Sequence, residues 1–278
     1  MRINHNISAM VTQGALYKSN RAMSVSLERL STGLRVNRAS DDAAGLGVSE
    51  NLRTQVRGVA QAQRNAQDGI AAFNIAEGAM NEISDILQRM RELAIQSSND
   101  TLTDTERGYL DTEFEALYGE ITRIADVTNY NGQSLLDGAG FGSAGTDELW
   151  IDAGDTSGTD SISGIRIDAV DANTLGVDDE DISTQGGATT AIGEIDTAID
   201  TVNNARADVG AYVNRLDHAI NNLMVSEANQ QSAESVIRDA DFATEAAKFT
   251  RNQILVQSGT AMLSQANVVP QAVLGLLG

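Results

Sequence analysis

The stretch from residue 52 to residue 94, LRTQVRGVAQAQRNAQDGIAAFNIAEGAMNEISDILQRMRELA, decides the fold. Its apolar side chains recur every seven residues, at Leu52, Val59, Ala66, Phe73, Met80, Leu87 and Ala94. Such a repeat is typical of a helix that packs lengthwise along another helix. Ser40-Asp41-Asp42 predicts the start of this helix and Asn99-Asp100 predicts its end. At 1.5 Å per residue the helix would extend roughly 85 Å, which predicts an elongated rod.

The next segments predict helices that pack back on the first one. Thr103 with Glu106 three residues later is a capping-box signature, and Asn131-Gly132 is a turn dipeptide. Between them, apolar residues follow steps of three and four at Leu110, Phe114, Leu117, Ile121 and Ile124. The same rhythm returns later in the chain, at Ile192, Ile195, Ile199, Val202, Val209, Val213, Leu216, Ile220 and Leu223. We therefore expect long antiparallel, coiled-coil-like helices.

The middle of the chain has a different pattern. Residues 148–152 and 161–168 alternate polar and apolar side chains around a polar loop, which predicts a β-hairpin. The remainder of 134–190, including Gly186-Gly187, is rich in Gly, Asp and Thr and is predicted to be loop. The predicted fold class is thus mainly α, with a small β-hairpin region at about 140–190.

Both ends of the chain carry their own apolar repeats. Ala9, Leu16, Met23 and Leu30 are seven residues apart, and so are Phe242, Phe249, Val256 and Leu263. Gln13 and Asn20 dilute the first stripe, so each terminal arm needs a partner helix. We predict that the arms pair together and act in self-assembly through Leu16, Met23, Leu27, Leu30, Leu34, Phe242, Phe249, Val256 and Leu263.

Composition and charge exclude several classes of protein. The net charge of −20 and the pI of about 4.3 argue against a nucleic-acid-binding surface. The chain contains no Cys, which excludes disulfides and thiolate sites. The first residues do not form a secretory leader, and no run of residues is long and apolar enough for membrane insertion.

Three motifs that resemble ligand sites favour ordinary structural explanations. Gly140–Gly145 matches GxGxxG but follows a turn rather than a strand, so it predicts a loop and not a nucleotide site. Asp178–Asp181 lacks the spacing of a calcium loop. His5 and His218 share no metal-ligand spacing. We therefore predict no catalytic residue, no metal site and no cofactor, and we do not expect an enzyme.

Several strings at the two ends resemble the bacterial flagellins. At the N-terminal end they are residues 3–10 (INHNISAM), 30–46 (LSTGLRVNRASDDAAGL) and 65–70 (NAQDGI). At the C-terminal end they are residues 238–241 (RDAD), 253–267 (QILVQSGTAMLSQAN) and the closing LLG. The resemblance covers about residues 1–136 and 190–278. It implies an inner-core domain of the arms 1–42 with 235–278, and an outer-core helical rod domain of residues 43–234.

The resemblance also implies a function and a set of partners. The chain would be the structural subunit of the flagellar filament, exported as a monomer by the flagellar type III apparatus and polymerised through its terminal helices for swimming. An export chaperone, the filament cap and the hook-junction proteins are the implied partners, and the filament would lie outside the cell or in a periplasm. Arg89, Leu93 and Glu113 match the residues that the flagellin-sensing Toll-like receptor contacts.

Two alternatives remain open at this point. One is a hook–filament junction protein, which has the same architecture. The other is a helical adaptor or adhesin that does not polymerise, since the apolar stripes alone require only some partner helix.

Overall fold

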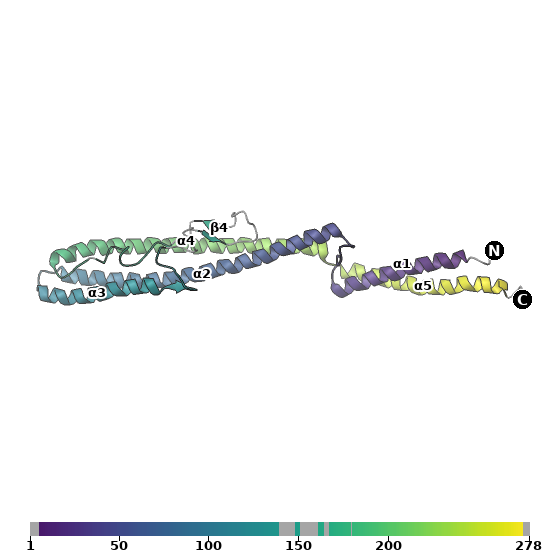
Figure 1. Cartoon of the computed structure of the whole chain (residues 1–278), viewed down its shortest axis with the longest axis horizontal. Coiled ribbons are helices and arrows are strands. Elements are labelled where there is room, and N and C mark those ends of the chain that lie inside the picture. The colour runs from purple at the N-terminus through teal and green to yellow at the C-terminus, as the bar shows by residue number, and fades with distance from the viewer. Residues whose placement is uncertain (1–5, 139–147, 151–160, 164–166, 179, 275–278) are drawn as a thin grey trace. The chain divides into compact units, whose positions relative to one another are not determined.

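A computed structural model describes residues 6–138, 148–150, 161–163, 167–178 and 180–274, and its five helices confirm the mainly α fold (Figure 1). The helices are α1 (Ile7–Thr32), α2 (Ala43–Ser97), α3 (Asp104–Val127), α4 (Gln185–Arg238) and α5 (Phe242–Leu274). The chain divides into two compact units, the terminal unit of residues 1–56 with 228–278 and the central unit of residues 57–227. The domain boundaries expected near residues 42 and 235 stay a prediction.

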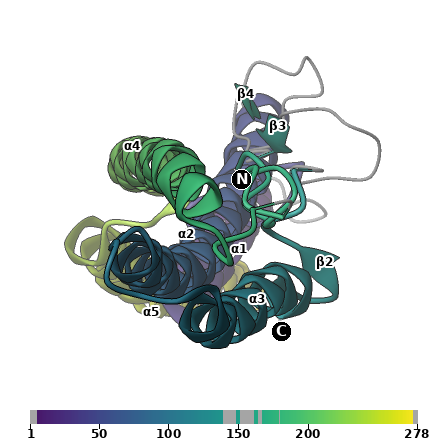
Figure 2. The same ribbon diagram turned by 90° about the vertical axis from the view of Figure 1, so that its left-hand side faces the viewer.

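The core of the central unit is built on the predicted stripe of α2. Val59, Ala66, Phe73, Met80, Leu87 and Ala94 are all buried. From Ala66 to Ala94 they share one apolar cluster with Phe114 and Ile121 of α3 and with every seventh residue of α4 from Ile195 to Leu216. Figure 2 shows the three helices packed beside one another. The periodicity therefore predicted both the helices and the face that each one buries.

The ends of α2 and α3 are formed by the residues that the sequence indicated. At the start of α2, the Asp42 carboxylate accepts the N–H of Gly45 at 2.9 Å. At the start of α3, Glu106 accepts the N–H of Thr103 at 2.8 Å and also its hydroxyl at 2.9 Å. These two bonds from Thr103 lower the pKa of Glu106. Capping bonds of this kind satisfy N–H groups that have no partner inside the helix.

Two short antiparallel hairpins follow. The strands β1 (Asn129–Tyr130) and β2 (Gln133–Ser134) flank Asn131 and Gly132, whose φ angles of 52° and 79° suit a type I′ turn. The strands β3 (Glu148–Trp150) and β4 (Ser161–Ser163) pair with Leu149 opposite Ile162. This pairing confirms the predicted hairpin over the described part of the middle segment.

The segment from residue 167 to residue 184 differs from the loop that was expected. Its described residues, 167–178 and 180–184, form no helix or strand, but Ile167, Val170, Ala172, Leu175, Val177 and Ile182 are all buried in the core of the central unit. The expectation that Gly186-Gly187 belong to this loop is wrong, because α4 begins at Gln185. Gly187 suits this helix start because a side chain there would collide with the carbonyl oxygen of Asp181.

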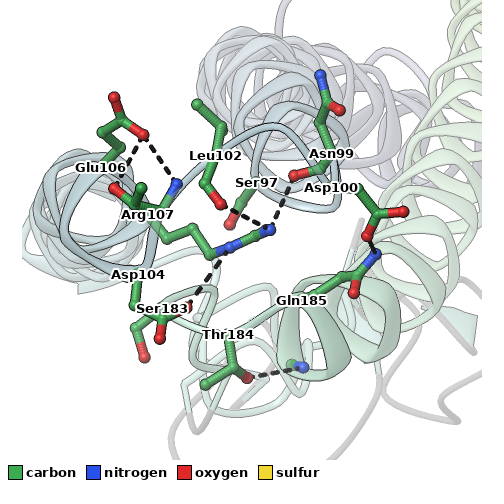
Figure 3. A network of polar contacts seen from close by, with 12 residues as sticks. Ser97, Asn99, Asp100, Leu102, Asp104, Glu106, Arg107, Ser183, Thr184 and Gln185 are labelled. Atoms are coloured by element: carbon green, nitrogen blue, oxygen red, sulfur yellow. Dashed lines mark hydrogen bonds and ion pairs between the residues drawn. The ribbon is translucent and has the colours of Figure 1, made fainter.

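A buried arginine holds the connection between α2 and α3 (Figure 3). The Nη2 of Arg107 donates to the carbonyl oxygens of Asn99 at 2.8 Å and Leu102 at 3.3 Å. Ser97 ties the same end to the segment before α4, because its hydroxyl donates to the carbonyl of Ile182 at 2.5 Å. The chain reversal between the two helices is thus fixed by bonds from side chains to backbone.

Candidate assembly surface on the paired terminal helices

In the terminal unit, α1 and α5 lie side by side along their length (Figure 1). At one end of the pair, Asn6 caps α1 by accepting the N–H of Ala9 at 3.0 Å, and its Nδ2 donates to the carbonyl of Ala266 at 2.9 Å. At the other end, Gly33 terminates α1 with a φ of 74°, and its carbonyl accepts the N–H of Ala240 at 2.9 Å. The pairing of the two arms, which the sequence predicted, is confirmed.

The contact between α1 and α5 follows one narrow seam. Partly buried positions recur every three or four residues on both helices, as a coiled-coil seam requires. On α1 they include Ala9, Thr12, Leu16, Ser19, Met23, Ser26 and Leu30, and on α5 they are Glu245, Phe249, Asn252, Val256, Gly259, Leu263 and Ala266. About half of these side chains are small or polar. The seam therefore buries less apolar surface than the core of the central unit.

One contact in the seam depends on glycine. A methyl group added to Gly259 would lie 3.2 Å from the Cδ1 atom of Leu16. That distance is tighter than ordinary van der Waals contact, so Leu16 occupies the space that the missing side chain leaves. This knob in a shallow hole helps to set the register between the two arms.

A buried carboxylate lies at the end of the seam. The side chain of Glu245 is only 6% exposed. It accepts a hydrogen bond from the Ser26 hydroxyl at 2.7 Å and one from Lys248 at 3.1 Å, and Arg29 is 3.9 Å away. Burial works to raise the pKa of Glu245, but the bonds from Ser26 and Lys248 and the charge of Arg29 together lower it. The carboxylate is therefore ionised and joins the two helices.

Outside the seam, the same helices carry large apolar side chains that are exposed. We call this set the outer face: Met10, Val11, Tyr17 and Leu27 on α1, and Ile254, Leu255 and Met262 on α5. Their exposed fractions run from 47% for Leu255 to 69% for Tyr17. In the sequence, no residue beyond Arg251 is charged. Large apolar side chains exposed in this number on two paired helices mark a site of protein association.

The structure separates the predicted self-assembly residues into three groups. Leu16, Met23, Leu30, Phe249, Val256 and Leu263 lie in the seam within one chain. Leu34 is partly buried beyond α1 and forms a β-bridge with Asp239. Only Leu27 and Phe242 are exposed. The rest of the outer face was not predicted, although Met10 with Tyr17 and Leu255 with Met262 repeat the seven-residue interval beside the main stripes.

The three residues expected to contact the Toll-like receptor are found on α2 and α3. The Nε and Nη2 of Arg89 both donate to one carboxylate oxygen of Glu113, at 3.0 and 2.8 Å. The bond that Arg89 donates to Glu113, with a second that it donates to Glu92, raises the pKa of Arg89. Leu93 is 1% exposed and belongs to the core. Arg89 and Glu113 therefore form the surface, while Leu93 supports it from beneath.

The motifs that resemble ligand sites lie only partly within the described residues. Residues 140–145 and His5 lie outside the described residues, as does residue 179 within the acidic run 178–181. His218 is exposed on α4. Among the described residues, no three metal-ligating side chains are grouped to hold an ion, and no helix has the length and apolarity needed to cross a membrane.

Known proteins similar to this chain are flagellins and flagellar filament proteins, and the relatives match along its whole length. The family model of the bacterial flagellin N-terminal helical region matches residues 3–140, and that of the C-terminal helical region matches residues 192–277. A flagellar filament 33 kDa core protein of Treponema phagedenis is 44% identical, with 100% of both chains covered. A flagellin of Halalkalibacterium halodurans is 45% identical, again with 100% of both chains covered.

A solved structure shares the fold at low sequence identity. It is described as a flagellar hook-associated protein from Vibrio parahaemolyticus, with a TM-score of 0.58 and 16% identity. The match covers 71% of this chain and 99% of that one. At this identity the likeness shows the fold alone, so it does not favour the hook–filament alternative over the full-length relatives.

A pair of terminal arms with exposed apolar side chains, together with a helical central unit, defines a structural subunit. The chain belongs to the bacterial flagellin family. It is a subunit of the flagellar filament, the self-polymerised structure that serves motility.

Proposed function

We propose that copies of this chain polymerise through the outer face of the paired arms. The observation that carries this proposal is the division of each arm into two stripes. One stripe is covered by the partner arm of the same chain, and the other, from Met10 to Leu27 and from Ile254 to Met262, is exposed. A second copy supplies the cover that the first copy lacks.

The size of the outer face suits cooperative assembly. Burying a large apolar side chain that starts fully exposed contributes about 1.5–3 kcal/mol, and these seven side chains are 47–69% exposed, so together they contribute on the order of 6–13 kcal/mol. Association costs about 4–15 kcal/mol in lost translational and rotational freedom. A single contact between two copies uses only part of the outer face. The free energy of that contact therefore exceeds the cost of association by little or nothing. Growth should therefore need several neighbours at once, which predicts slow nucleation and fast elongation from seeds.

Two methionines with similar exposure provide the test. Met262 of the outer face is 62% exposed and Met224 on α4 in the central unit is 55% exposed. In growth from filament seeds, we expect Met262→Asp to abolish elongation, because each copy would bury an unpaired charge. Met224→Asp is the matched control and should elongate normally. Normal elongation of Met262→Asp would overturn the proposal.

The remaining functional assignments belong to the same proposal and rest on the family resemblance. The chain acts as a structural protein and not as an enzyme. It is exported by the flagellar type III apparatus, an export chaperone holds the C-terminal arm before assembly, and the cap and hook-junction proteins contact the ends of the filament. The filament works outside the cell or in a periplasm.

Receptor recognition is also proposed from the resemblance, through the surface pair Arg89 and Glu113. The double variant Arg89→Ala with Glu113→Ala should weaken receptor activation by soluble monomer without changing the elongation rate. The control is Arg123→Ala with Glu120→Ala, which removes another exposed pair of α3, bonded at 2.6 Å. Equal activation by both double variants would contradict this assignment.

A further inference from the structure

A basic groove lies on the arm pair, beside the seam. Its volume is about 420 Å³, and it is lined by Lys18, Arg21, Ala22, Val25, Ser26, Arg29, Glu245, Lys248, Arg251 and Asn252. Five of these residues are cationic and one is anionic. The chain as a whole has 39 acidic and 19 basic residues, and its two lysines are both in this groove. The basic groove therefore has the opposite charge to the molecule.

Three of the five cations are available to a ligand. Glu245 is engaged by Ser26, Lys248 and Arg29, as described above. Lys18, Arg21 and Arg251 are exposed, and within the described part of the chain none of them forms an ion pair. Three like charges grouped on one surface repel one another, so an anionic partner would be attracted to them.

The terminal unit also carries carboxylates that are not paired with a cation. We call residues 33–42, between α1 and α2, and residues 239–241, between α4 and α5, the joining segments. Their acidic side chains Asp41, Asp42, Asp239 and Asp241 are all exposed. Within the described residues they accept hydrogen bonds from backbone N–H groups or hydroxyls and form no salt bridge. The other acids of this unit, Glu28, Glu50, Glu234 and Glu245, are in salt bridges.

The cations and these carboxylates are too far apart to pair within one copy. Lys18 lies 14 residues before the end of α1 at Thr32, which corresponds to about 21 Å along the helix. Arg251 lies ten residues after Asp241, the residue that caps α5, or about 15 Å. A lysine or arginine side chain does not cross such a distance. The complementary charges therefore meet only between copies.

We propose that the basic groove receives the acidic joining segments of a second copy of this chain. The inference rests on the proposed function, because arms that pack on arms bring the terminal units of two copies together. In the described part of this unit every other acidic residue is in a salt bridge, and no side chain beyond Arg251 is charged. The outer face supplies most of the binding free energy. The basic groove determines which segment of the neighbouring copy lies against the arm pair.

The two lysines make a direct chemical test possible. A carbodiimide joins a lysine amine to a carboxylate in contact with it, as an amide, with loss of water. Filaments grown from an equal mixture of ¹⁴N and ¹⁵N protein are treated and digested, and mixed-isotope products identify links between copies. We expect Lys18 linked to the peptide with Asp41 and Asp42, or to the one with Asp239 and Asp241. The link between Lys248 and Glu245 inside one chain is the positive control, since that pair is 3.1 Å apart.

A charge variant gives an independent readout. Arg21→Gln with Arg251→Gln removes two charges from the groove, and Arg57→Gln with Arg64→Gln removes two exposed charges from the central unit. Because exposed ion pairs contribute modestly and are screened by salt, we expect the groove variant to raise the critical concentration for growth about threefold to tenfold. We also expect a weaker salt dependence than in the natural protein, while the control variant behaves like the natural protein.

The outcomes separate this inference from the proposed function. Filaments that give the Lys248 link but no link from Lys18 to another copy would overturn the groove contact and leave the polymerisation surface intact. Links from Lys18 to acids of the central unit would overturn the choice of the joining segments. Normal growth of Met262→Asp would instead reject the outer face.

Discussion

Replacing Glu245 by alanine should loosen the arm pair selectively. The variant leaves the Ser26 hydroxyl, which is 3% exposed, without its acceptor in the seam. A hydrogen bond to a charged group contributes about 1.5–3 kcal/mol. The partly exposed pair with Lys248 adds about 0.2–1 kcal/mol. Removing the carboxylate also removes the cost of burying it, so we expect a net loss of about 2 kcal/mol.

Amide hydrogen exchange of the monomer measures this loss where it occurs. A change of about 2 kcal/mol corresponds to about 30-fold faster opening of α1 and α5. The amides of the central unit should keep their rates. A double-mutant cycle with Ser26→Ala isolates the bond, because the two substitutions together should cost little more than Glu245→Ala alone. Unchanged exchange in α1 and α5, or an equal acceleration in both units, would refute this reasoning.

The same carboxylate predicts a pH dependence. The pKa of Glu245 is lowered in the folded arm pair, so the folded state holds the ionised form more strongly than the unfolded chain does. This stabilisation is complete above the ordinary pKa of a glutamate and is lost as the pH falls below it through the folded value. The free energy of opening α1 and α5, taken from exchange after correction for the intrinsic pH dependence of amide exchange, should therefore fall with acid more in the natural protein than in Glu245→Ala.

Four further predictions test the rest of the structure. Leu263→Asp puts a charge in the seam at a cost of about 3 kcal/mol, so filaments should not form while circular dichroism still shows a folded central unit; global unfolding would contradict this. Gly259→Val forces Leu16 to move and should cost the arm pair about 1–3 kcal/mol, seen as faster exchange. Phe114→Ala should lower the free energy of unfolding by about 3–5 kcal/mol in denaturant titration, whereas exposed Tyr109→Ala should change it by less than about 0.5 kcal/mol. Protease should trim roughly residues 1–42 and 235–278 from the monomer first and leave them intact in filaments; equal trimming in both states would argue against burial of the arms.

The sequence by itself determined the helices and the face that each one buries. The seven-residue repeat of α2, the carboxylate before Ala43 and the turn at Asn131-Gly132 are local signals, because helix periodicity, capping and turn geometry depend on residues close together in the chain. Each of them appears in the structure where the sequence predicted it.

Only the tertiary structure decided what covers each apolar stripe. A stripe shows that a helix has an apolar face, but the identity of the partner depends on residues far away in the chain. Leu16 lies against Gly259 of the same chain, which leaves Met10, Tyr17 and Met262 for a neighbour. The sequence predicts only a loop for the apolar segment before α4, because burial without regular structure has no period. Lys18 and Lys248 line one groove only because α1 and α5 pair, and no local pattern in the sequence records that proximity.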